Sequence, residues 1–105
     1  MAGTDLTKKD IIDLLRKSRA KLSSLGVKSI GLFGSFVRGD ASAESDIDVL
    51  VELDPEKRTY DNFIETCFLL EELFDRKVEV VTADSISPYI KPYVLKEVEY
   101  VPLSA

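Results

Sequence analysis

The chain of 105 residues has no histidine, one cysteine and no long hydrophobic run. Without histidine it lacks the side chain that most often exchanges protons near neutral pH, and also the commonest zinc ligand. The single cysteine, Cys67, cannot form an internal disulfide, which fits a reducing compartment and leads us to expect a cytoplasmic protein. No apolar stretch is long enough to span a bilayer, and no signal peptide is expected. Any chemistry must therefore depend on carboxylates, phosphates and metal ions.

An excess of basic residues is also missing, since 14 Lys and Arg stand against 19 Asp and Glu. Autonomous nucleic-acid binders usually carry a basic surface, so we expect no extended nucleic-acid groove. The length predicts one domain over residues 1–105 with a modest core, for which a hydrophobic fraction of 45% is ordinary.

Hydrophobic periodicity predicts helices that alternate with strands, which is typical of an α/β fold. We expect a small three-stranded mixed sheet flanked by about four helices, whose sheet edges need protection or a partner. The predicted strands span 27–33, 47–53 and 77–82. The predicted helices span 7–26, 59–74 and 88–97, with about one further helical turn inside 34–45.

The most informative segment is a glycine-bounded turn followed by two acidic residues. Gly34 and Ser35 come directly after the first predicted strand, and Asp46-Ile47-Asp48 opens the second. Residues i and i+2 of a strand point to the same face, so Asp46 and Asp48 should project side by side. Two adjacent carboxylates repel each other unless a cation lies between them, and magnesium typically binds one or two carboxylates plus substrate phosphates.

Glu79 is the third acidic candidate, because it interrupts an otherwise apolar strand. If strand 77–82 lies beside strand 47–53, Glu79 reaches the same site as Asp46 and Asp48. Three carboxylates suit a pair of magnesium ions that clamp the attacking and leaving oxygens of an in-line displacement, with Glu79 as a metal ligand and candidate base. The alternative is that Glu79 protects an exposed sheet edge against aggregation.

Gly34, Ser35 and Arg38 are the candidates for binding a nucleotide's phosphates. Gly34 has no Cβ to obstruct a phosphate, the Ser35 hydroxyl and nearby backbone N–H groups can donate to phosphate oxygens, and Arg38 can add a charged contact. Two structural alternatives stay open: Ser35 as a helix N-cap, and Arg38 paired with Asp40 or Glu44 on the surface.

The combination of Gly34-Ser35, Asp46-Ile47-Asp48 and Glu79 resembles the motif of the nucleotidyltransferase superfamily typified by DNA polymerase beta. The longer run over residues 34–51 is similar to the minimal nucleotidyltransferase (MNT) branch, and the similarity extends over about 27–101. Glu79 departs from the pattern of that branch, which more often has Asp there, although the longer side chain can still reach a metal ion.

The resemblance implies a nucleotidyltransferase fold and an enzyme that uses ATP with two Mg²⁺ ions to transfer AMP to a protein hydroxyl. It also implies an antitoxin whose partner and acceptor is a helical HEPN-domain toxin. The predicted helix 59–74 is more widely apolar than one core stripe requires, and the C-terminus is rich in tyrosine, so both are expected partner surfaces. That partner is either the toxin or another copy of the chain.

Two alternatives to this function stay open. In the first, the site is catalytically weak or inactive and the antitoxin neutralises its partner by binding alone, which the Glu at position 79 favours. In the second, the chain transfers nucleotides to a small molecule or an RNA end. The negative net charge and the lack of an acceptor domain argue against this second alternative.

Overall fold

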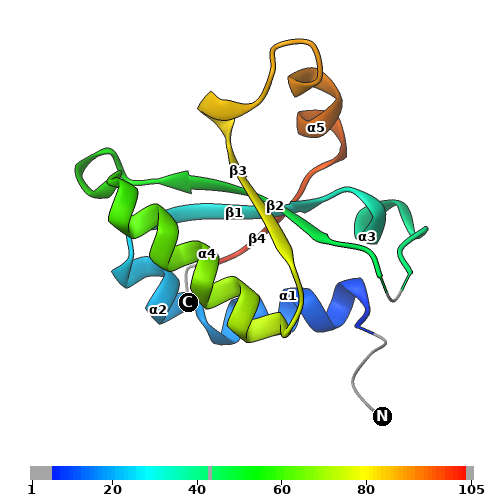
Figure 1. Ribbon diagram of the computed structural model, residues 1–105, viewed down its shortest axis with the longest axis horizontal. Coiled ribbons are helices and arrows are strands. Elements are labelled where there is room, and N and C mark those ends of the chain that lie inside the picture. The colour runs from blue at the N-terminus through cyan, green and yellow to red at the C-terminus, as the bar shows by residue number, and fades with distance from the viewer. Residues whose placement is uncertain (1–5, 43, 104–105) are drawn as a thin grey trace.

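The computed structural model describes residues 6–42 and 44–103, where one sheet separates two unequal layers of helices (Figure 1). The helices are α1 (Lys8–Lys17), α2 (Arg19–Ser24), α3 (Ser35–Arg38), α4 (Tyr60–Phe74) and α5 (Lys91–Glu97). The strands are β1 (Val27–Phe33), β2 (Ile47–Leu53), β3 (Val78–Thr82) and β4 (Glu99–Val101), and two 3-10 turns are η1 (Pro55–Lys57) and η2 (Ala83–Ser85). Figure 1 shows α1, α2 and α4 on one side of the sheet and α5 on the other.

The strand order β3-β2-β1-β4 makes a mixed sheet. β1 and β2 are antiparallel neighbours, and the chain between them reverses locally through α3. β2 and β3 are parallel, because α4 carries the chain back across the sheet before β3 begins. This crossover brings the start of β3 beside the start of β2.

The main core lies between the sheet and the layer formed by α1, α2 and α4. The alternate residues Ile47, Val49, Val51 and Leu53 of β2 are all buried there, as the period of two in the sequence predicts. The opposite face of the sheet carries a smaller apolar cluster centred on Leu50, Ile86 and Val94. That face is thus only partly filled by side chains.

The prediction of three strands is wrong, because β4 adds a fourth. Residues 99–101 pair antiparallel with Ile30, Gly31 and Leu32 of β1, and Val101 is buried in the main core. A segment this short shows too little periodicity to be recognised, and it is stabilised by pairing with an edge that would otherwise be exposed. β4 therefore covers the edge of β1 that would be exposed in the predicted three-stranded sheet.

The first predicted helix is divided at Ser18 into α1 and α2. A capping box formed by Thr7 and Asp10 opens α1, and Ser18 N–H donates to the carbonyl oxygens of Leu14 and Leu15 in a bifurcated bond that closes it. Ser18 has no large apolar side chain to pack into the core at this position. After the break, α2 still places Leu22 fully inside the core.

The last helix begins at Lys91, three residues later than predicted. Pro92 consequently lies in the first helical turn, where its missing N–H costs no hydrogen bond. The helix at 59–74 begins at Tyr60 with Thr59 as its N-cap, close to the prediction. In the part of the chain that the structure describes, no helix is both long and apolar enough to cross a membrane.

Candidate functional site

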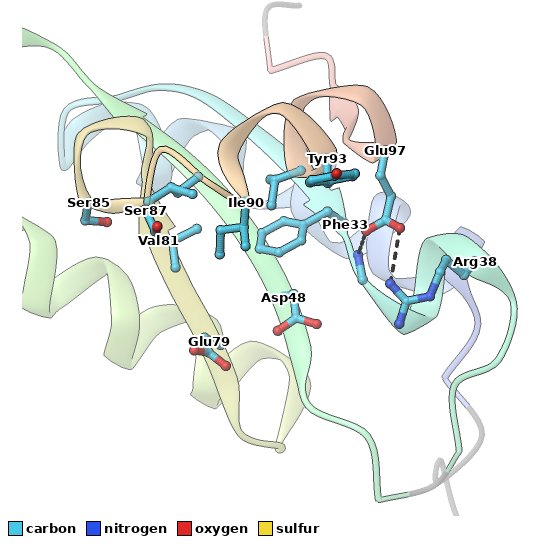
Figure 2. Close-up of a pocket in the computed structure, with 13 residues that line it drawn as sticks. Phe33, Arg38, Asp48, Glu79, Val81, Ser85, Ser87, Ile90, Tyr93 and Glu97 are labelled. Atoms are coloured by element: carbon cyan, nitrogen blue, oxygen red, sulfur yellow. Dashed lines mark hydrogen bonds and ion pairs between the residues drawn. The ribbon is translucent and has the colours of Figure 1, made fainter.

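A pocket of about 430 Å³ opens on the sheet face that carries α5 (Figure 2). One end is polar and contains the carboxylates of Asp48, Glu79 and Glu97 together with Arg38 and Gly34. The rest of the lining is mainly apolar, with Phe33, Val81, Ile86, Ile90, Tyr93 and Val94, and also includes Ser85 and Ser87. A ligand with a charged part and a flat apolar part fits this division.

Asp48 and Glu79 are register partners on the parallel strands β2 and β3. Both line the pocket, so their carboxylates lie on the same face of the sheet, as Figure 2 shows. The strand adjacency on which the prediction for Glu79 depended is therefore present. Glu79 is also exposed on the edge strand of the described sheet, so its position fits the edge-protecting alternative as well.

Asp46 lies just before β2 and is half-buried, but it does not line this pocket. Its backbone neighbours are held from both sides: Arg76 donates to the carbonyl oxygen of Ser45 at 3.2 Å, and Ile47 N–H donates to the carbonyl oxygen of Lys77 at 3.2 Å. These bonds attach the entry into β2 to the turn that follows α4. The position of Asp46 is thus set by the end of α4.

The acidic side chains do not by themselves form a three-ligand metal site. Among residues 6–42 and 44–103, no three His, Cys, Asp or Glu side chains are grouped closely enough to hold a metal ion. The assignment of Asp46, Asp48 and Glu79 as metal ligands therefore stays a prediction. Carboxylate oxygens are suitable ligands for magnesium, which is often bound by one or two carboxylates together with the phosphates of the substrate.

Gly34 forms the sharp turn between β1 and α3. Its φ of 84° and ψ of −152° are accessible to glycine but strained for other residues. A Cβ at this position would overlap the Asp48 carboxylate and stand 3.0 Å from the Asp48 Cγ. Glycine is therefore required both by the backbone conformation and by the close approach of β2.

Ser35 is the first residue of α3 and is half-buried. The N-cap position belongs to Gly34, and no side-chain hydrogen bond caps the helix, so the alternative of Ser35 as the N-cap is wrong. Ser35 does not line the pocket, and its carbonyl oxygen accepts from the N–H groups of Gly39 and Asp40. Its role in phosphate binding stays a prediction.

Glu97 belongs to the pocket and was not predicted. It is the last residue of α5, and its two carboxylate oxygens accept from Gly34 N–H at 2.7 Å and from Arg38 Nη1 at 3.1 Å. Arg38 also pairs with Asp40 at 3.4 Å, as one alternative suggested, and the two carboxylates raise the pKa of the guanidinium. One feature of the sequence could have identified Glu97: it is an acidic residue in the last turn of a helix, where the helix dipole disfavours negative charge.

The pKa of Asp48 is raised from its usual value of 3.8 to about 6. Burial of the carboxylate is the largest cause, followed by repulsion from Glu79 and Asp46 and a smaller repulsion from Glu97, while Arg38 acts in the opposite direction. Without a cation, the Asp48 carboxyl therefore keeps its proton to a higher pH than an isolated aspartate does.

This shift predicts a pH dependence of stability in the absence of metal. The folded protein binds the Asp48 proton more tightly than the unfolded chain does, so the contribution to stability is complete below about pH 3.8 and is lost as the pH rises through about 6. An Asp48→Asn variant is neutral throughout. In the presence of a chelator, its Tm relative to that of the wild type should rise between about pH 4 and about pH 7. A difference in Tm that is constant over this range would contradict the shift.

Comparison with known proteins adds to this geometry. The family model for the nucleotidyltransferase domain matches residues 12–101. Protein adenylyltransferase MntA of Thermococcus cleftensis is 39% identical over 97 residues, which cover 91% of this chain and 97% of that protein. A solved structure assigned as a minimal nucleotidyltransferase is 29% identical with a TM-score of 0.70, over 92% of this chain and 98% of the other.

A crystal structure of a toxin–antitoxin with AMP-PNP contains a chain that is 28% identical to this one, with a TM-score of 0.59 over 92% of this chain and 73% of the other. The resemblance inferred from Gly34-Ser35 and Asp46-Ile47-Asp48 is thus confirmed at the level of the family, and the matched span includes all of the pocket. The chain belongs to the nucleotidyltransferase domain family, in the branch of minimal nucleotidyltransferases that includes MntA, and is a nucleotidyltransferase enzyme.

Proposed function

We propose that this nucleotidyltransferase transfers AMP from ATP to a hydroxyl group of a partner protein, and that the partner is a HEPN-type toxin for which the chain is the antitoxin. The observation that carries the proposal is the two-ended pocket, in which Asp48 and Glu79 are paired across neighbouring strands beside Gly34 and Arg38. The relatives support the chemistry, since one is named a protein adenylyltransferase and another was solved in a toxin–antitoxin structure with AMP-PNP.

The polar end of the pocket suits the triphosphate. Arg38 and the N–H of Gly34 are the donors that we assign to the phosphates, and Gly34 has no Cβ to obstruct a phosphate. Magnesium held by Asp48 and Glu79, with Asp46 as a third ligand, would neutralise charge on the phosphates and on the leaving group. Ser35 is proposed to add a further hydrogen bond from the start of α3.

The reaction exchanges one phosphorus–oxygen bond for another. The acceptor's hydroxyl oxygen attacks the α-phosphorus, the bond from that phosphorus to the α,β-bridging oxygen breaks, and pyrophosphate leaves. The hydroxyl proton passes to a carboxylate at the polar end, for which we propose Glu79. Holding the two reactants in line is the main contribution available to a protein in such transfers.

The apolar end of the pocket suits the nucleoside. Ile90, which precedes α5, and Tyr93 of α5 line the pocket together with Val81 of β3, and Figure 2 shows the Tyr93 ring near Glu97. Aromatic and aliphatic side chains bind a base through stacking and apolar contact, which requires no particular hydrogen-bonding edge. We therefore propose that the base is held mainly by its flat faces.

The partner protein must supply the acceptor, because the pocket lies open on one face of a small chain. Large apolar side chains are exposed on α4, where Tyr60 is 77% and Phe68 is 62% accessible, and around α5, where Tyr89 and Tyr93 are 86% and 74% accessible. Exposed apolar side chains of this size are typical of protein–protein contact surfaces. The group around α5 adjoins the pocket and is the proposed surface that brings the acceptor hydroxyl to the α-phosphate.

The proposal is tested by labelled transfer. The purified chain is incubated with Mg²⁺ and a purified HEPN-type toxin, using ATP labelled on the α-phosphate in one reaction and on the γ-phosphate in another. AMP transfer predicts a toxin labelled from the α-phosphate only, together with release of pyrophosphate. Label from the γ-phosphate, or no label with a toxin that the chain nevertheless neutralises, would contradict the proposal.

A second candidate is an antitoxin that acts by binding alone. It is favoured by the absence of a three-ligand metal group among the described residues and by glutamate at position 79. It predicts that variants of Asp46 and Asp48 still neutralise the toxin in cells. Loss of neutralisation by these variants, with complex formation retained, would exclude it.

A further inference from the structure

The Glu97 carboxylate occupies the two donors that the proposed function assigns to phosphate. One oxygen accepts from Gly34 N–H at 2.7 Å, and the other accepts from Arg38 Nη1 at 3.1 Å. Figure 2 shows both contacts at the polar end of the pocket, with Glu97 reaching across from α5. The donors are therefore already bound to an anion that belongs to the chain itself.

These contacts are of the kind that a phosphate would make. Short hydrogen bonds from a backbone N–H and a guanidinium to an anionic oxygen are characteristic of carboxylate and phosphate recognition alike. The Glu97 side chain is 24% exposed, so water can reach it, and a phosphate group arriving from the pocket meets the same two donors. Glu97 and a nucleotide cannot both use them fully.

Glu97 also adds negative charge to an end of the pocket that already contains Asp48 and Glu79. A triphosphate entering this end is repelled by all three carboxylates, and Arg38 is the cation among the residues that line the pocket. Since Arg38 pairs with Glu97 and Asp40, the attraction it can offer to a phosphate is reduced in this state.

We propose that Glu97 is an affinity-setting residue, which competes inside the chain for the phosphate-binding donors and must be displaced when the nucleotide binds. The inference rests on the proposed function of the pocket. The Glu97 side chain is 24% exposed and can turn toward solvent. Because β4 begins at Glu99 and pairs with β1, the backbone at the end of α5 stays in place, and rotation of the side chain alone releases Gly34 N–H and Arg38 together.

A positioning role would have the opposite consequence. If Glu97 were needed to orient Gly34 and Arg38 for the nucleotide, its removal would disorganise the donors and weaken binding. Competition instead predicts that binding becomes tighter when the charge is removed. The sign of the change in affinity therefore separates the two roles.

The experiment measures the dissociation constant of a non-hydrolysable ATP analogue by titration calorimetry, for the wild type, E97Q and E99Q. Glutamine has the shape of glutamate and can still accept from Gly34 N–H, so E97Q removes the charge with little change in packing. E99Q removes the same charge two residues away, from a side chain paired with Lys8 outside the pocket. Thermal unfolding of each variant shows whether the fold is retained.

We expect E97Q to bind the analogue about five- to tenfold more tightly than the wild type, the scale expected for freeing one charge-assisted pair. E99Q should stay within about twofold of the wild type, because an exposed and screened charge contributes little. Equal or weaker binding by E97Q overturns the inference. If E97Q does not fold, E97D, whose shorter side chain withdraws from Gly34, should also bind more tightly than the wild type.

Failure of the inference and failure of the proposed function give different results. A wild type that binds the analogue while E97Q binds no better overturns the role of Glu97 and leaves the nucleotide site in place. Absence of binding in both proteins overturns the nucleotide site and the inference together. Binding by E97Q with none detectable in the wild type supports both.

Discussion

An Asp48→Asn variant is expected to lose AMP transfer by a factor on the order of 10³, which is the scale of removing one strong electrostatic contact to a reacting group. Asp48 is the carboxylate that lies between the other acidic groups, opposite Glu79 on β3 and against Gly34 at the turn. Asparagine keeps the shape of the side chain but loses the charge that magnesium requires. The rate of α-label transfer to the acceptor measures the loss.

The matched control for this variant is Glu52→Gln. Glu52 lies on the same strand as Asp48, is exposed, and accepts a hydrogen bond from Ser29 rather than facing the pocket. The control should transfer AMP at nearly the wild-type rate, and both variants should fold. Transfer by Asp48→Asn at a rate close to that of Glu52→Gln would mean that Asp48 has no part in the chemistry.

Gly34→Ala is expected to destabilise the protein by about 2–5 kcal/mol, because it combines backbone strain with overlap in a packed region. The φ of 84° is unfavourable for alanine, and the new methyl group would meet the Asp48 carboxylate. Relief of this overlap requires movement of Asp48 or of the turn itself. We therefore also expect nucleotide binding to be lost even where the variant remains folded.

Gly39→Ala tests a positive φ without the overlap, at a ψ of 12° where the left-handed backbone is less strained than at Gly34. Gly39 has a similar φ of 87°, but a Cβ there would meet no other atom within 4 Å. It should cost only the strain of the left-handed backbone, about 1–2 kcal/mol. Denaturant unfolding of both variants gives the comparison, and equal destabilisation would show that the contact with Asp48 contributes nothing.

The elements that local sequence patterns predicted well are those built from contacts between near neighbours. The buried face of β2 follows from alternation along the strand, and the end of α4 at Phe74 follows from the residues around it. The positions of Asp48 and Glu79 on neighbouring strands depended on one further step, the parallel crossover through α4. The family could be identified from the sequence because the Gly-Ser and Asp-Ile-Asp parts of its motif lie within 15 positions of one another, from Gly34 to Asp48.

The sequence by itself thus determined the main strands, the glycine at the turn and the family to which the chain belongs, because each depends on spacing along the chain. The tertiary structure alone decided the pairing of β4 with β1 and the place of Glu97, whose partners Arg38 and Gly34 are 59 and 63 residues away. No local pattern encodes a contact of that separation, since it arises only when the sheet and α5 have packed together.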